Sequence, residues 1–131
     1  MEVERFSELV DEAIASIPEE FRSRLENIAI QIRPIATPNM SRNLSRNPWG
    51  LLGLYQGVPY AGRGPWYGGV LPDRILIFQK PIERVARTAA GIRKLVREVV
   101  IHEVGHYFGL EEDELREIER EVRRSRQGEK K

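Results

Sequence analysis

The strongest constraint on the fold is a long helical pattern in the last third of the chain. Its apolar residues recur three and four positions apart: Ile92, Leu95, Val96, Val99 and Val100. This spacing predicts a helix with one apolar face. The pattern continues without a break into the run His102-Glu103-Val104-Gly105-His106, and Gly109 is a typical residue to end it. Within the segment that follows Pro81, Gly91 is a candidate break between two helices.

The first third of the chain predicts a second amphipathic helix and a strand. Apolar residues at helical spacing extend from Glu4 to Ser16, and Pro18 stops this pattern. A short second helical start, from Pro18 to about Leu25, has acidic residues in its first turn. Apolar and polar residues then alternate from Ile28 to Ile32, which predicts a half-buried strand that Pro34 ends.

The region from Pro34 to Pro72 is rich in proline and predicts mostly ordered, irregular loop, including Tyr60 to Gly69. Within it, Leu51 to Gln56 is expected to form a short strand. A stronger strand follows at Arg74 to Phe78, and both can pair with the first strand in one sheet. A disordered linker would not carry as many aromatic side chains as this region does: Trp49, Tyr55, Tyr60, Trp66 and Tyr67.

The whole pattern predicts a single α+β domain over residues 1–131. A small mixed or mostly antiparallel sheet would pack against the N-terminal helix and the long helix. A last, highly charged helix is expected at about Glu112 to Arg124, with a frayed tail at 125–131. The chain is 40% hydrophobic and 31% charged, which is ordinary for a globular domain and argues against disorder.

Composition excludes several classes of protein. There is no cysteine, so no disulfide can form and any metal site must use His, Asp or Glu. The net charge of +1 gives no strong attraction to nucleic acid or membrane. The N-terminus lacks the pattern of a secretion signal, and no apolar run approaches the ~20 residues that span a bilayer. We therefore expect a cytoplasmic protein.

The spacing of the two histidines points to a metal. His102 and His106 are four residues apart and are the only 2 histidines in the chain, so on a helix both lie on one face. Both imidazoles can then reach one zinc at ~2.0–2.1 Å. Glu103 is rotated by about 100° from His102, so it can reach a zinc-bound water without being a ligand. The alternative is two ordinary histidines; the helical context, the apolar run before them and the stop at Gly109 favour the metal site.

A catalytic zinc site needs a third protein ligand. Glu112 lies three residues after Gly109, where a reversal of the chain can bring it over the metal. Asp113 is adjacent and chemically equivalent, and position alone favours Glu112. Alternatively, Glu112 and Asp113 bind no metal and only form the first turn of the last helix, where acidic side chains interact favourably with the helix dipole.

The run from His102 to Leu110 resembles the signature of the short bacterial zincin-like metallopeptidases, the minimal zincins. Further similar stretches are Gly53 to Gly57, Tyr67 to Ile75 and Pro18 to Leu25. The resemblance implies an α+β fold with a small sheet on the active-site helix, and one zinc ion per chain. It also implies His102 and His106 as zinc ligands and Glu103 as the catalytic carboxylate. The family usually has Asp where this chain has Glu112.

These features predict hydrolysis of a peptide or protein substrate through a zinc-bound water that Glu103 activates. Tyr60 and Tyr67 are candidates to stabilise the oxyanion, with packed or rim tyrosines as the alternative. The substrate is expected to lie along a sheet edge by strand addition.

Two other functions compete with this prediction. Bacterial endoribonucleases of rRNA maturation also use two histidines four apart, but Glu103 after the first histidine favours a peptidase and the charge offers no evident RNA channel. A catalytically silent, metal-bound adaptor is the other, and it would not need Glu103.

Overall fold

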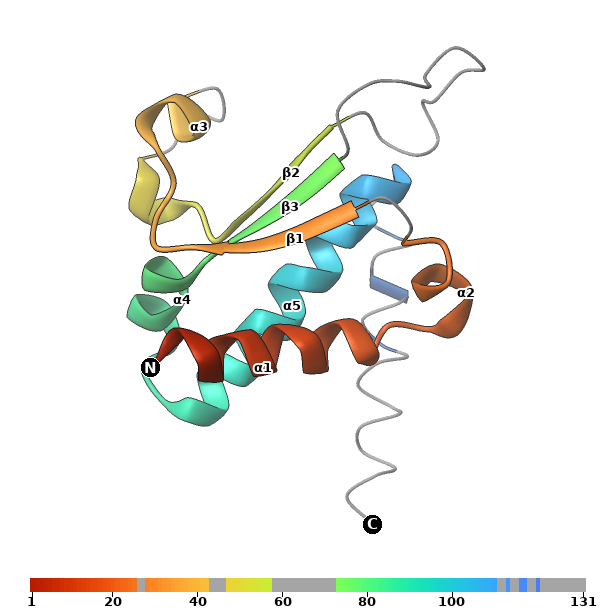
Figure 1. Cartoon of the computed structure of the whole chain (residues 1–131), viewed down its shortest axis with the longest axis horizontal. Helices are drawn as coiled ribbons and strands as arrows, with labels where there is room; N and C mark the ends of the chain where they lie inside the picture. The colour runs from red at the N-terminus through yellow and green to blue at the C-terminus, as the bar shows by residue number, and fades with distance from the viewer. Residues whose placement is uncertain are drawn as a thin grey trace.

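The computed structural model describes residues 1–25, 28–42, 47–57 and 73–110, together with Asp113, Arg116, Glu117 and Arg120. The elements run in the order α1 (Val3–Ala15), α2 (Glu19–Arg22), β1 (Ile28–Arg33), α3 (Pro38–Arg42), the 3-10 helix η1 (Pro48–Gly50), β2 (Gly53–Gln56), β3 (Asp73–Phe78), α4 (Gln79–Ala86) and α5 (Ala89–Phe108). The predicted α+β class and its N-terminal and long helices are confirmed (Figure 1).

The sheet is mixed, with the strand order β1-β3-β2. β3 lies in the centre, parallel to β1 and antiparallel to β2. The register pairs Ile30 of β1 and Tyr55 of β2 with the same residue, Ile75. All three strands expected from the sequence are therefore present in one sheet, and within the described residues β2 forms one of its edges.

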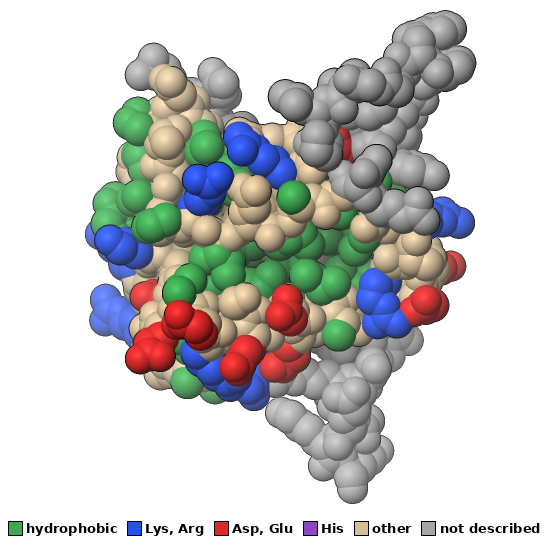
Figure 2. Space-filling view, viewed as in Figure 1, with side chains coloured by type: hydrophobic (Ala, Val, Ile, Leu, Met, Phe, Trp, Pro, Cys, Tyr) green, Lys and Arg blue, Asp and Glu red, His purple; other side chains and the backbone are tan. Residues whose placement is uncertain are grey.

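Both faces of β3 are covered, which explains why this strand is almost continuously apolar. Ile75 and Ile77 belong to the main core, whereas Leu76 and Phe78 point to the opposite face and join a smaller cluster that contains Leu51. The main core also contains the apolar faces of α1 and α5, which cross beneath the sheet (Figure 1). The buried side chains of α1 are Phe6, Leu9, Val10 and Ala13. Figure 2 shows a band of hydrophobic side chains across this face of the molecule, between β1 and α1.

Two expectations from the sequence were wrong in detail. The proline-rich region is not irregular throughout, because α3 and η1 form within it. The helical segment was expected to begin after Pro81, but Pro81 lies within the first turn of α4, where a missing N–H costs no helical hydrogen bond. Residues 60–69, expected to be loop, lie outside the described residues.

Gly91 does not divide the two helices. The break between α4 and α5 falls at Arg87, whose φ is 61°, and at Thr88, which caps α5. Gly91 lies inside the first turn of α5 and donates its N–H to Oγ1 of Thr88 at 3.0 Å. A Cβ at Gly91 would lie 2.9 Å from that same Oγ1, so glycine allows the close cap.

The predicted end of the long helix is confirmed at Gly109, which adopts the left-handed conformation with φ 69°. The N–H of Leu110 then donates to the carbonyl of Gly105 at 3.0 Å. Beyond this turn, Asp113, Arg116, Glu117 and Arg120 are helical. Among the helices that the structure describes, none is long and apolar enough to cross a membrane.

Candidate metal centre

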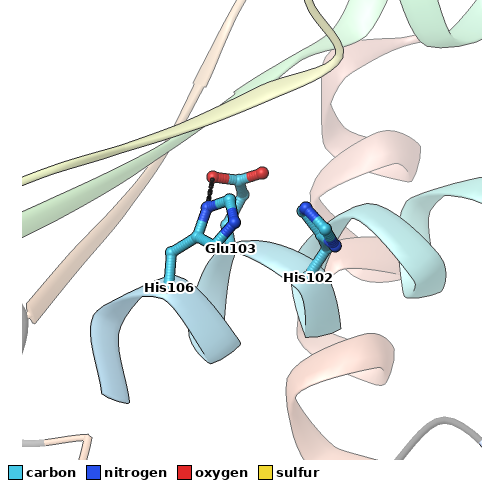
Figure 3. A group of neighbouring side chains, drawn as sticks. All are labelled: His102, Glu103 and His106. Atoms are coloured by element: carbon cyan, nitrogen blue, oxygen red, sulfur yellow. Dashed lines mark hydrogen bonds and ion pairs between the residues drawn. The ribbon is translucent and has the colours of Figure 1, made fainter. Parts of the chain in front are cut away.

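α5 carries the three side chains of the candidate site. His102, Glu103 and His106 lie on the second half of this helix, directly after buried Val100 and Ile101. Figure 3 shows the three side chains on one side of α5, with the Glu103 carboxylate beside the ring of His106. Glu103 is only 6% exposed, whereas the side chain of His106 is 47% exposed. The helix therefore combines a buried carboxylate with an imidazole that solvent can reach.

The Glu103 carboxylate is fixed from two sides. Its Oε1 accepts a hydrogen bond of 2.9 Å from the backbone N–H of Tyr55 in β2. Nδ1 of His106 lies 3.3 Å from the same oxygen. Burying a carboxylate costs free energy unless it is hydrogen-bonded. The hydrogen bond from Tyr55 therefore offsets part of the cost of burying Glu103.

β2 approaches α5 unusually closely at Gly53. A Cβ at this position would lie 2.6 Å from Cγ1 of Val99 and 3.1 Å from Cγ of Glu103. Any larger residue would push the strand away from the helix. Gly53 therefore brings the backbone of β2 within hydrogen-bonding distance of Glu103.

The pairing of β2 with β3 determines which of its backbone groups face the site. Phe78 donates its N–H to the carbonyl of Leu52 at 3.0 Å, so this residue pair is hydrogen-bonded. Hydrogen-bonded and non-hydrogen-bonded pairs alternate along an antiparallel ladder. The backbone N–H and C=O of Gly53 and Tyr55 thus face away from β3, and the bond from Tyr55 to Glu103 agrees with this.

A cleft of about 620 Å³ lies between β2 and α5. One wall is the segment from Gly50 to Tyr55, and the other is formed by α5. The residues of the second wall are Glu98, Val99, His102, Glu103 and His106. The candidate site therefore opens into a groove that follows the edge of the sheet.

The donor set fits a zinc ion. One potential ligand atom from each of His102, Glu103 and His106 lies within 4.8 Å of the other two. The two imidazole rings are 4.5 Å apart between centroids. Two nitrogens bound to one zinc lie at most about 4.2 Å apart, twice the Zn–N distance. The separation of the His102 and His106 side chains is therefore close to the one that a shared zinc ion requires.

Comparison with protein families agrees with this geometry. The model of the zincin-like metallopeptidases matches residues 25–122, which is most of the chain. The chain belongs to this family. The match includes all three strands and the whole of α5, so the sheet and the helix described above form a minimal zincin-like fold. No curated protein matches the chain.

In this member of the zincin-like metallopeptidase family, the structure brings His102, Glu103 and His106 together on one face, as expected from their spacing. Asp113, the alternative third ligand, is exposed and helical and is not part of this group. The favoured third ligand, Glu112, lies outside the described residues, as do the oxyanion candidates Tyr60 and Tyr67.

Sequence reasoning missed the two residues of β2 that hold Glu103. Gly53 left a signal, because a glycine inside a strand pattern often marks a close approach of two backbones. Tyr55 left none, since its contribution is a backbone N–H that any residue except proline supplies.

Proposed function

We propose that this zincin-like metallopeptidase hydrolyses peptide bonds, using one zinc ion held by His102, His106 and Glu112. The observation that carries the proposal is the buried Glu103 carboxylate, fixed at 2.9 Å by β2 and placed beside two histidines of one helix. A buried acceptor at this place, at the side of an open cleft, is what proton transfer during hydrolysis needs.

Zinc, when bound, supplies a Lewis acid that makes water more acidic and polarises the scissile carbonyl. Glu103 accepts the proton of the attacking water and delivers it to the leaving amine. The hydrogen bond from Tyr55 keeps one carboxylate oxygen in place, which leaves the other to move the proton. Tyr60 or Tyr67 would supply a second donor to the oxyanion.

The substrate would be an extended peptide that adds to the edge of the sheet at β2. Gly53 lines the cleft, and its backbone groups that face away from β3 can pair with the peptide, while the N–H of Tyr55 is occupied by Glu103. Pairing of this kind recognises the peptide backbone and not the side chains, so it gives affinity for many sequences.

We take the substrate to pair antiparallel to β2, and the course of β2 along α5 then gives its direction over the site. Gly53 lies against Val99 and Glu103, and the ring of Tyr55 packs on Tyr107 further along the helix. β2 and α5 therefore run in the same general direction. A peptide antiparallel to β2 runs the opposite way, so the residues after its scissile bond lie toward Val99 and the start of the cleft.

The test compares three preparations on a mixture of unfolded peptides analysed by mass spectrometry. These are the zinc-loaded protein, the protein stripped by a chelator, and the zinc-loaded Glu103→Gln variant. We expect new peptide termini from the first preparation alone, with recovery when zinc is returned to the second. Cleavage of structured RNA in place of peptides would favour the endoribonuclease, and stoichiometric zinc without any turnover would favour the adaptor.

A further inference from the structure

One acidic side chain in the cleft has no part in the proposed hydrolysis. Glu98 lines the cleft one helical turn before His102. Within the described parts of the chain, no hydrogen bond or ion pair involves its carboxylate. The nearby arginines of α5 face the other way: Arg93 and Arg97 lie 3.4 Å and 3.9 Å from Glu12 of α1. Lys94, one helical turn before Glu98, is exposed and is not part of the cleft lining. Glu98 thus offers a negative charge to whatever occupies the cleft.

The surroundings of Glu98 suit a long cationic side chain. Leu52 lines the cleft on the β2 side, and Val99 lines it beside Glu98 on α5. Leu51 and Leu54 also border the cleft, but they pack on the smaller cluster at the other face of the sheet. Lys and Arg bury their aliphatic stems against apolar surface and keep the charged end at a polar group. The apolar lining of the cleft would contact the aliphatic stem of such a side chain, and the Glu98 carboxylate would meet its charged end.

The distance along the helix indicates which part of a substrate would meet Glu98. Four residues of α-helix rise by about 6 Å, which separates Glu98 from His102. An extended peptide rises about 3.4 Å per residue, so this distance corresponds to about two residues. For the antiparallel pairing proposed above, these are the first two residues after the scissile bond.

We propose that Glu98 gives the cleft a preference for Lys or Arg on the leaving-amine side of the scissile bond. This inference rests on the proposed peptidase function and names its substrate class: peptides with a basic residue just after the cleaved bond. A cation that is partly desolvated at Glu98 gains more from the pairing than it would at an open surface.

A competing role for Glu98 is structural. It precedes His102 by four residues, so its carboxylate could instead orient the ring of His102 for the metal. In that role, loss of the charge would weaken zinc binding and would affect all substrates equally. Specificity and zinc content therefore separate the two roles.

The experiment uses pairs of quenched fluorescent peptides that carry Lys or norleucine at each of the first two positions after the cleaved bond. Norleucine has a similar stem without the charge. For the zinc-loaded protein we expect kcat/KM to be about tenfold higher with Lys. The ratio should fall toward one in Glu98→Gln, and Glu98→Lys should prefer Glu at the same position. Glu4→Gln, an equal change of charge on exposed α1, should keep the ratio of the unmodified protein.

Two results would overturn the inference: equal rates for the two peptides with the unmodified protein, or an unchanged ratio in Glu98→Gln. The second result together with lost zinc would assign Glu98 to the positioning of His102. If no peptide is cleaved at all, the proposed function fails, and fluorescence anisotropy with the same peptides decides the inference separately. Tighter binding of the Lys peptide that requires Glu98 would uphold it, and equal binding would refute it.

Discussion

The backbone N–H of Tyr55 donates a 2.9 Å hydrogen bond to Oε1 of Glu103, joining the edge strand of the sheet to the helix that carries the histidines. These residues are 48 positions apart in the sequence. The position of the carboxylate therefore depends on tertiary structure, while the two histidines are placed by one helix.

This relationship gives a prediction for two substitutions of Glu103. Glu103→Gln keeps an oxygen that accepts the bond from Tyr55, so the fold and zinc content should be retained while kcat/KM falls by about 10²–10⁴-fold. Glu103→Ala removes the acceptor. This variant should show the same fall in kcat/KM, and its unfolding free energy should also be lower by about 1–3 kcal/mol. Chemical denaturation beside peptide hydrolysis checks both. Equal stability of the two variants would contradict the structural role of the bond.

The two histidines predict a stability that depends on zinc. At free zinc about 100 times the Kd, binding should stabilise the fold by about 2.7 kcal/mol, visible as a higher Tm by calorimetry. His102→Ala and His106→Ala should each abolish this shift, because each removes a ligand. The apo forms of the variants provide the baseline. A zinc-dependent shift that survives in His106→Ala would exclude this residue from the site.

The third ligand can be assigned by a matched pair of neutral substitutions. Glu112→Gln should lower the zinc content of the protein after gel filtration, whereas Asp113→Asn should leave it unchanged. Asp113 is exposed and separate from the group of His102, Glu103 and His106, which agrees with this expectation. The opposite pattern would move the ligand to Asp113.

The close approach of β2 to α5 predicts that Gly53 tolerates no side chain. Gly53→Ala would place a Cβ 2.6 Å from Cγ1 of Val99, so we expect a loss of about 1–3 kcal/mol of stability and reduced hydrolysis. Gly50→Ala is the control, because its Cβ would meet nothing closer than Oδ1 of Asn47 at 3.9 Å. Trimming the neighbour in a Gly53→Ala/Val99→Ala double variant should restore part of the loss. Equal stability of the two alanine variants would show that the strand can shift at no cost.

The turn between α4 and α5 predicts a stabilising substitution. Arg87 has a φ of 61°, and the N–H of Thr88 donates to the carbonyl of Ala86 at 2.7 Å, which closes a tight turn around it. This conformation is strained for a residue with a side chain. Arg87→Gly should therefore raise the unfolding free energy by about 1 kcal/mol. Lys94→Gly, in the regular part of α5, should lower it by about the same amount. If Arg87→Gly lowered the unfolding free energy as Lys94→Gly does, the backbone at Arg87 would not be strained.

Most of the regular structure was predictable because periodicity is a local property of the sequence. The helical spacing along α5 and the alternation along β1 each predicted the right element, and Gly109 ended the long helix as expected. The two-histidine site followed from the same local pattern. Local spacing also fixes which residues share a helix face, so this part of the site needed no knowledge of the fold.

The features that the sequence did not predict depend on contacts between distant segments. α3 has only five residues, and Met40 within it packs on a small cluster that includes Leu76 and Phe78 of β3. No periodic pattern can emerge over a single turn, so proline content dominated the prediction there. The role of Glu98 in the wall of the cleft likewise appeared only when β2 was placed opposite α5.

The placement of His102 and His106 on one continuous helix also affects how a preparation of this protein should be judged. A partly unfolded chain in which β2 has detached from α5 still presents both imidazoles at helical spacing, and zinc can favour that helix. The same chain has lost the strand that holds Glu103 and forms one wall of the cleft. Zinc can thus bind before β2 and α5 have come together. The zinc content of a preparation therefore does not measure the fraction of molecules with an assembled site.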